Sequence, residues 1–328
     1  MLTLAEGART RVAEAMTSPR TYVYAGVVGA ITAVFVALGL KQALVLGAIG
    51  GSAYGLLALG LVLVYKSSGV FNFAQAEFGT VAVYFLYIFK GVLPYPLALL
   101  GALVVAIVMG LLVERLIVRP LFDAPRVTLL VATAGVALAA IGLEFWLGEP
   151  KLRSITPLFS RGDRLAILGQ RISDQQIFLV VTLLALGVLL ALFFSRTNLG
   201  LAILGASQEP VATELVGISV RRLSSFTWGL AALLGGIAGV LFVPISGTFG
   251  PGAMTSAVLI PAFTAAVLGG MSSLPGAFLG GAIVGVAQAA AISYDGFKSV
   301  PGKGSVVVFL LLVVVLAVRP QGLLGSKA

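Results

Sequence analysis

The sequence predicts an all-α fold in which a polytopic bundle of eight to ten transmembrane helices forms a single domain over residues 1–328. Hydrophobic residues make up 59% of the 328 residues, charged residues make up only 10%, and the mean hydropathy is +1.10. In soluble proteins, about a quarter of the residues are charged. Because a membrane span needs roughly 20 apolar residues, about ten spans would use most of the chain. We therefore expect no appended ATPase or other soluble domain.

We expect a span wherever an apolar run is long enough to cross the bilayer. The first run lacks the small-residue cleavage site of a secretory signal, so it is interpreted as a retained helix. The short runs 257–272 and 276–292 are joined only by the sequence SSLP and could form either two spans or one re-entrant hairpin. The candidate spans are 22–40, 43–65, 73–89, 96–117, 127–147, 177–194, 223–245, 257–272, 276–292 and 304–318.

Basic residues predict the orientation of these spans. Ten crossings place both termini on one side, and the side with more Lys and Arg is expected to be cytoplasmic. Residues 148–176 also contain basic side chains, but we expect them outside, as a cap over the external mouth. The net charge of +9 is spread over short loops, so it does not predict nucleic-acid binding. The basic residues on the cytoplasmic side are Arg9, Arg11, Arg20, Lys66, Arg115, Arg119, Arg126, Arg196, Arg221, Arg222, Arg319 and Lys327.

The chain contains no cysteine and no histidine. This composition excludes disulfides, Cys or His metal sites, thiol chemistry and a histidine base. Only carboxylates and amides remain for specific polar interactions. They are too scattered for an intramembrane enzyme, which needs paired catalytic groups. We therefore expect neither a catalytic site nor a bound metal or cofactor in this chain.

Glycines recur at helical spacing in three of the predicted spans. Small residues let helix backbones approach closely in lipid, where there is no hydrophobic drive between helices. The spacing favours packing within one subunit, and a subunit interface is the alternative. These glycines are Gly47, Gly51 and Gly55, then Gly235 and Gly239, then Gly276, Gly280, Gly281 and Gly285.

Polar residues at the start of the span 73–89 are the strongest candidates for a solute path. Asn72, Gln75 and Glu77 alternate there with aromatic residues that include Phe73. A carboxylate at bilayer depth costs roughly 3 kcal/mol, so Glu77 needs a partner or a water-filled cavity. The alternative is that Glu77 lies in a first helical turn near the interface, where the helix dipole favours an anion and solvent is close.

Two further polar residues are weaker candidates. Glu144 lies near the outer end of its predicted span, and we expect it to face solvent. Gln288 lies deeper in an alanine-rich run, where it could line the path or hydrogen-bond a neighbouring helix.

The long hydrophilic segment 196–222 is predicted to lie on the cytoplasmic side, where it can transmit the movement of a separate protein to the membrane helices. A short helix is expected over residues 207–216, with Ser207 as cap, Glu209 and Pro210 in the first turn and Gly217 at the end. Its apolar stripe needs a groove on a partner, or else it lies on its own bundle or on lipid headgroups. The stripe contains Val211, Leu215 and Ile218, and Gln208, Thr213 and Glu214 lie opposite.

Six motifs in order give the chain a family resemblance. They are GSAYGLLALGLVLVY (51–65), NFAQAEF (72–78), VERLIVRPL (113–121), ELVGI (214–218), FTAAVLGGMSSLPGAFLGG (263–281) and RPQGLLG (319–325). Together they closely resemble the LivH-type permease of branched-chain amino acid ABC transporters, over a core of residues 43–325.

The resemblance implies a multi-pass subunit of the bacterial inner membrane. Its implied partners are two cytoplasmic ATPases that bind ATP and Mg²⁺, a LivM-like permease or a second copy of this chain, and an extracytoplasmic solute-binding protein. Residues 206–219 would be the coupling helix, and residues 72–78 would lie near the path. The family also resembles importers of urea, amides and aromatic acids, so the solute class extends to small polar molecules.

Three features depart from the family pattern. Gln75 and Ala76 replace a usual His-Gly pair, Leu201 and Leu204 stand where arginines are common, and residues 1–42 add a helix. The alternative function, from a different class, is a stand-alone secondary transporter or channel in which Glu77 takes up a proton or cation. No GxxxxGK[ST] phosphate loop occurs in the chain, so any ATP must bind to a partner.

Overall fold

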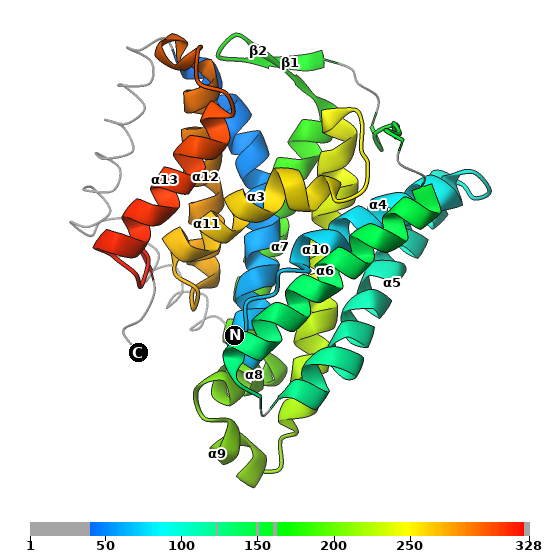
Figure 1. Cartoon of the computed structure of the whole chain (residues 1–328), viewed down its shortest axis with the longest axis vertical. Helices are drawn as coiled ribbons and strands as arrows, with labels where there is room; N and C mark the ends of the chain where they lie inside the picture. The colour runs from blue at the N-terminus through cyan, green and yellow to red at the C-terminus, as the bar shows by residue number, and fades with distance from the viewer. Residues whose placement is uncertain (1–39, 123, 149–150, 160–162, 325–328) are drawn as a thin grey trace, which may run out of the picture.

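The computed structural model describes residues 40–122, 124–148, 151–159 and 163–324. Within this part of the chain, helices pack side by side into a bundle, and the element labels follow Figure 1. Apart from Leu40, the predicted helix 22–40 lies outside the described residues.

Every predicted apolar run from residue 43 onward coincides with a helix. The position of each helix is therefore explained by local hydropathy alone. The helices are α3 (Lys41–Ser68), α4 (Gln75–Lys90), α5 (Tyr95–Val113), α6 (Arg126–Gly148), α7 (Asp174–Arg196), α10 (Val220–Ser246), α11 (Ile260–Gly269), α12 (Leu274–Ser293) and α13 (Lys303–Val318). Short irregular turns extend α5 through Glu114–Val118 and Arg119–Leu121, precede α11 at Thr255–Leu259 and follow α12 at Asp295–Phe297.

The structure confirms a polytopic helical protein but not a count of eight to ten spans. Among the described residues, six helices are long and apolar enough to cross a membrane. They are Lys41–Ser68, Tyr95–Leu121, Arg126–Gly148, Asp174–Arg196, Val220–Ser246 and Leu274–Ser293. The apolar helices Thr255–Gly269 and Lys303–Val318 are shorter. With 16 residues, α4 is about 24 Å long, less than the hydrocarbon thickness of a bilayer.

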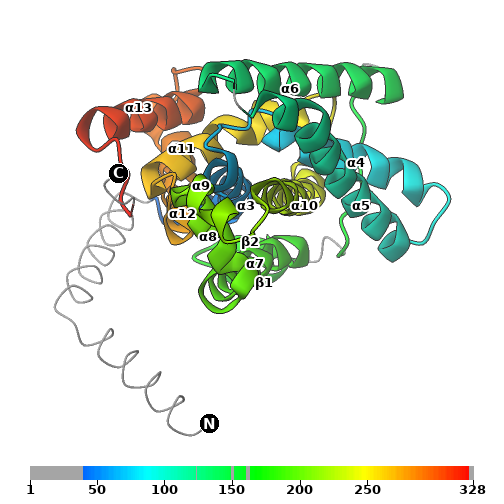
Figure 2. The same cartoon turned by 90° about the horizontal axis from the view of Figure 1, so that it is seen from below.

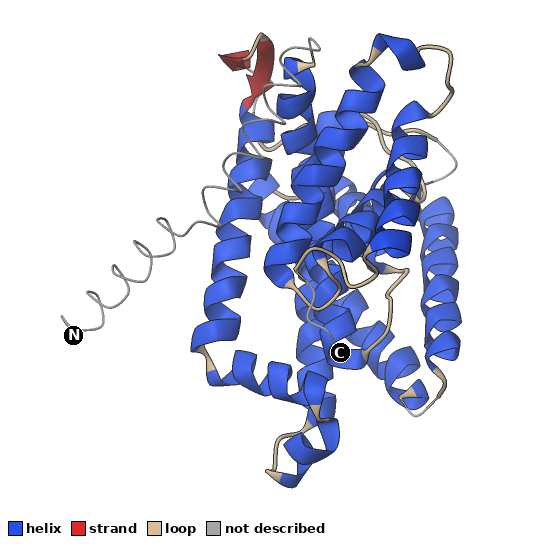
Figure 3. Cartoon of the chain, turned by 90° about the vertical axis from the view of Figure 1, so that its left-hand side faces the viewer, coloured by secondary structure: helices blue, strands red, loops and turns tan. Residues whose placement is uncertain are grey.

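A small β-hairpin corrects the all-α prediction. Strands β1 (Asp163–Ile167) and β2 (Gln170–Ser173) pair antiparallel within the loop predicted as an external cap. Leu168 and Gly169 form the turn between them, with positive φ angles of 51° and 84°. The hairpin lies at the end of the bundle opposite the projecting segment that contains residues 198–215 (Figure 3). Hydropathy does not reveal this hairpin, because strands this short have a weak sequence signal.

Helices α3 and α10 form the centre of the bundle (Figure 2). Most of their membrane-crossing windows are buried, whereas α5, α6 and α7 expose most of theirs. The exposed apolar surfaces of these three helices are typical of contact with lipid or with another membrane subunit.

The glycine repeats pack helices within the subunit. A Cβ on Gly51 would lie 2.5 Å from the Gly281 carbonyl oxygen, and one on Gly285 would lie 2.2 Å from that of Gly47. The same close approach joins α10 to α4 at Gly239 and α12 to α11 at Gly276 and Gly280. Intrasubunit packing, the favoured interpretation of the spacing, is therefore what the structure shows.

Candidate functional site

The break between α3 and α4 is held together by side-chain amides. Gly69, with φ of 66°, ends α3 in a left-handed conformation. Asn72 Oδ1 accepts a 3.0 Å hydrogen bond from the Ala74 N–H, and its Nδ2 donates to Gln75 Oε1 at 3.2 Å. Gln75 Nε2 donates in turn to the Ala231 carbonyl of α10 at 2.8 Å. Both side chains are buried, so these bonds replace the water that the amides lose.

Aromatic rings and one hydroxyl attach this link to two other helices. The Phe73 ring stacks on Phe263 of α11, with ring centroids 6.3 Å apart. Thr133 of α6 accepts a hydrogen bond from the Phe73 N–H at 3.3 Å and donates to the Phe71 carbonyl at 3.1 Å. Thr133 did not stand out in the sequence, because a threonine inside a helix has no sequence signal for a tertiary hydrogen bond.

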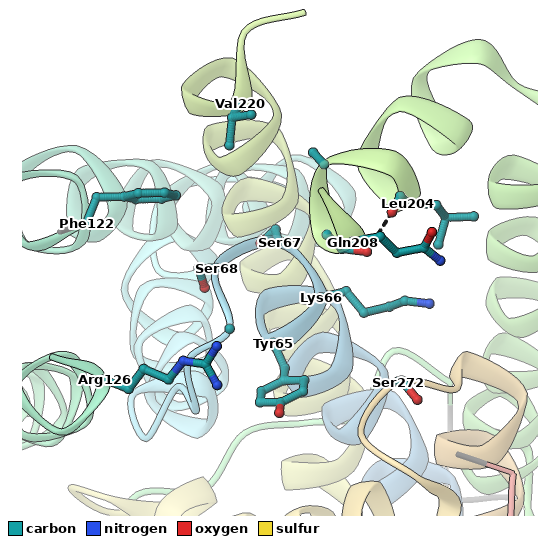
Figure 4. A pocket seen from close by; sticks show the side chains of 13 residues that line it. Tyr65, Lys66, Ser67, Ser68, Phe122, Arg126, Leu204, Gln208, Val220 and Ser272 are labelled. Atoms are coloured by element: carbon teal, nitrogen blue, oxygen red, sulfur yellow. Dashed lines mark hydrogen bonds between the residues drawn. The ribbon is translucent and has the colours of Figure 1, made fainter. Parts of the chain in front are cut away.

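Next to this link lies a cavity of about 710 Å³ (Figure 4). It joins the end of α3 and the start of α6 to α8 (Asn198–Gln208) in the predicted coupling loop. Figure 4 shows Arg126 and Tyr65 pointing into the same space and Lys66 extending toward Gln208. The residues that line the cavity are Tyr65, Lys66, Ser67, Ser68, Gly69, Phe122, Arg126, Leu204, Ala206, Ser207, Gln208, Val220 and Ser272.

The charges around this cavity are positive. Lys66 and Arg126 line it, and none of its described lining residues is acidic. Several hydroxyls add hydrogen-bonding capacity, including Tyr65, Ser67 and Ser272. Such a lining can hold water and small polar or anionic groups. From the sequence, Lys66 and Arg126 indicate only topology, because only the folded chain brings these two positions together.

The predicted coupling helix is split in two. Ser207 lies in the last turn of α8, where its hydroxyl donates to the Leu204 carbonyl at 2.7 Å, so it is not a cap. A second helix, α9 (Pro210–Leu215), begins three residues later, with Glu209 as its N-cap. The prediction of one helix from 207 to 216 was wrong, because Glu209 precedes a proline and takes a non-helical φ of −136° and ψ of 80°. The predicted end at Gly217 agrees with its positive φ of 83°.

The apolar side chains of α9 face away from the bundle. Val211, Leu215 and Val216 are 72%, 83% and 73% exposed. Thr213, predicted on the polar side, is buried instead and donates a hydrogen bond to the Glu209 carbonyl at 2.9 Å. In Figure 1, α9 projects at one end of the molecule, beyond the other described helices. The alternative that Val211 and Leu215 pack on their own bundle is therefore wrong.

The remaining candidate residues lie in different surroundings. Gln288 accepts a hydrogen bond from the Tyr54 hydroxyl of α3, as expected for a bond between helices. It lines a small cavity of about 170 Å³ that contains none of the residues 72–77. Glu77 lies in the first turn of α4, as one interpretation predicted, but it is fully buried, so the solvent contact of that interpretation is wrong. Glu144, expected to face solvent, is also fully buried.

Comparison with known proteins gives consistent results. The family described as the branched-chain amino acid transport system permease component matches residues 43–316. The permease protein BraD of a high-affinity branched-chain amino acid transport system from Pseudomonas aeruginosa is 34% identical, over 87% of this chain and 95% of its own length. LivH of Escherichia coli, with the same description, is 31% identical, over 84% and 92%. A probable LivH from Methanocaldococcus jannaschii is 29% identical, over 88% and 93%.

These relatives are transport permeases and not enzymes, as the sequence predicted for this chain. The matched residues contain both the α3–α4 link and the α8–α9 segment. The chain therefore belongs to the family of branched-chain amino acid transport system permease components.

Proposed function

We propose that this chain is the transmembrane permease subunit of an ATP-driven ABC importer of the bacterial inner membrane, with both termini in the cytoplasm. The solute is a branched-chain amino acid or a related small polar molecule, with urea, amides and aromatic acids included in that class. The names of the BraD and LivH relatives support the amino-acid assignment. The basic residues at the ends of the described helices support the orientation.

The proposed partners follow from the exposed surfaces. Two cytoplasmic ATPase subunits bind ATP and Mg²⁺, and one of them seats α9 in a groove. Exposed aliphatic side chains on a projecting short helix support this contact, because an apolar face in water is costly. A LivM-like permease or a second copy of this chain covers part of the apolar surface of α5, α6 and α7, lipid covers the rest, and an extracytoplasmic protein delivers the solute.

The residues proposed for ATPase coupling are those of the α8–α9 segment. Thr213 is a buried side chain of α9, with its hydroxyl bonded to the carbonyl of the N-cap residue Glu209, and Val211 and Leu215 face the partner. The coupling residues are Ser207, Glu209, Pro210, Val211, Glu214, Leu215 and Gly217.

The solute path is proposed to pass the α3–α4 link and leave through the cationic cavity. The path residues that belong to the link or follow it directly are Asn72, Phe73, Gln75 and Glu77. Gln288 of α12, which bonds Tyr54 of α3, is proposed to border the path at another point along α3. The cavity supports this route because the end of α3 and α8 form two of its walls. Movement of α9 by the ATPases would shift α8 and change the cavity, a rigid-body switch between two packed arrangements.

The alternative, a stand-alone secondary transporter that couples through Glu77, is not favoured. The relatives that match most of this chain are described as components of branched-chain amino acid transport systems.

The exposure of α9 is the observation on which the mechanism depends, so it is tested first. We expect the double variant Val211→Asp, Leu215→Asp to lose co-purifying ATPase and ATP-driven uptake by at least about tenfold, since burying each aliphatic side chain contributes about 1.5–3 kcal/mol. ATPase recovery is measured by mass spectrometry of the complex in mild detergent, and uptake of labelled leucine in cells.

The matched control is Val300→Asp, an exposed valine in the loop between α12 and α13. We expect this variant to keep both its ATPase partners and its uptake. Normal ATPase recovery and uptake in the α9 double variant would refute α9 as the coupling element.

A further inference from the structure

Two buried glutamates meet where α4, α6 and the connection between α10 and α11 come together. Glu77 lies in the first turn of α4 and Glu144 near the end of α6, and neither is exposed. Glu144 Oε2 accepts a 2.8 Å hydrogen bond from the Gly252 N–H. A Cβ at Gly252 would lie 4.0 Å from Glu77 Oε1, and the two carboxyl groups are within hydrogen-bonding reach of each other.

Three of the four carboxylate oxygens of the pair lack a hydrogen-bond donor. Among the described residues, no group donates to either carboxylate oxygen of Glu77 or to Glu144 Oε1. The same chain shows how a buried carboxylate is normally satisfied. Glu114, 1% exposed, receives hydrogen bonds from Arg119 at 2.9 Å and from the Ser225 hydroxyl at 2.8 Å.

Two ionised carboxylates in contact away from water are strongly unfavourable, because like charges repel and neither group can donate a hydrogen bond. A single proton between them removes one charge and supplies the missing donor, as in carboxylate pairs of other proteins. We propose that Glu77 and Glu144 form a binding site for one shared proton, which joins α4 to α6 and, through Gly252, to the segment that leads into α11.

Another buried polar group without a hydrogen-bond partner lies near the pair. The Tyr84 hydroxyl is buried, with 1% of the residue exposed, and it has no hydrogen-bond partner. It lies two turns after Glu77 on α4, beside Gly148, which follows Glu144 by one turn at the end of α6. Buried polar atoms without hydrogen-bond partners on Glu77, Glu144 and Tyr84 therefore lie in one region of the bundle.

No described basic side chain pairs with Glu77 or Glu144. Arg153 is the basic side chain whose charge acts on the Tyr84 hydroxyl. Its guanidinium, however, donates to the Gly148 carbonyl at 2.6 Å and lies over the Tyr87 ring at 5.0 Å. From the α10–α11 connection, the pair meets the Gly252 N–H, and the Met254 N–H is already bonded to Thr80 at 3.2 Å. No described arginine or lysine forms a salt bridge with either glutamate.

The shared proton is a property of this chain alone and does not depend on the proposed solute or ATPases. Gly252 has a φ of 67°, so its backbone N–H can turn toward Glu144 in a conformation that other residues rarely adopt. The proton would hold the first turn of α4 in place next to the α3–α4 link.

The test uses the full-length chain purified with its natural partners. Infrared difference spectra between wild type and Glu144→Gln, and between wild type and Glu77→Gln, should each show the loss of one protonated-carboxyl band at neutral pH. Glutamine is suitable because its amide can donate to the remaining carboxylate, and at position 144 its oxygen can still accept from Gly252. Glu114→Gln is the matched control and should retain the band.

The pH dependence of thermal stability provides a second readout. If the folded chain retains a proton that free glutamate side chains release, the wild-type melting temperature should fall between about pH 6 and pH 9 more than that of Glu144→Gln. Retention of the carboxyl band in both variants, or parallel melting curves across this range, would overturn the proposal. Stabilisation of wild type by sodium ions, with no carboxyl band, would also overturn it by indicating a bound metal cation in place of the proton.

Discussion

At the scale of single residues, the α3–α4 link depends on side-chain amides that replace the regular helical hydrogen bonds. Gln75 is the central member, because it bonds both Asn72 before it and the Ala231 carbonyl of α10. Its amide also lies against Gly60, where a Cβ would approach Gln75 Nε2 to 2.1 Å. Three helices therefore meet at one buried side chain.

Replacing Gln75 with leucine should destabilise the protein. The change removes two buried hydrogen bonds and leaves the Asn72 amide without an acceptor, at a cost of about 1–3 kcal/mol. Thermal unfolding of the purified complex measures this loss. Gln208→Leu, at an exposed position with no side-chain hydrogen bond among the described residues, should change stability by less than about 0.5 kcal/mol. Equal effects of the two substitutions would show that the Gln75 bonds do not stabilise the link.

At the scale of helices and loops, the apolar pattern predicted each described span but not the details between spans. Hydropathy located α3 to α7 and α10 to α13 because a span needs only a long apolar run. It could not predict the burial of Glu144, which depends on the distant Gly252 turn. It also could not predict that Lys66 and Arg126 line one cavity, because these residues are far apart in the sequence and only tertiary packing brings them together.

The contact between α3 and α12 gives a prediction at this scale. Gly285→Leu should strongly reduce the amount of folded protein, since even a Cβ would lie 2.2 Å from the Gly47 carbonyl oxygen and force the two helices apart. Gly142→Leu on α6 is the control, because a Cβ there meets nothing within 4 Å. Size-exclusion profiles of the detergent-extracted variants report the outcome. A normal profile for Gly285→Leu would show that the α3–α12 approach is not required for folding.

At the scale of the whole molecule, the structure separates a tightly packed unit from a region that can rearrange. Helices α3 and α12 have backbones in direct contact at glycines, so we expect them to move together. The cavity, in contrast, has walls on α3, α6 and α8, and α8 leads directly to the exposed α9. A force on α9 is therefore expected to change the cavity before it changes the α3–α12 contact.

The absence of cysteine allows this expectation to be tested by site-specific labels. Spin labels at Gln208→Cys on α8 and Val127→Cys on α6 span the cavity, and we expect their distance to change when non-hydrolysable ATP is added to the assembled transporter. Labels at Leu46→Cys on α3 and Ile283→Cys on α12, both exposed positions, should keep their distance. The two pairs differ because the first crosses water-accessible space and the second a close-packed contact. An ATP-dependent change in the α3–α12 pair with none across the cavity would place the moving boundary elsewhere and refute the proposed exit route.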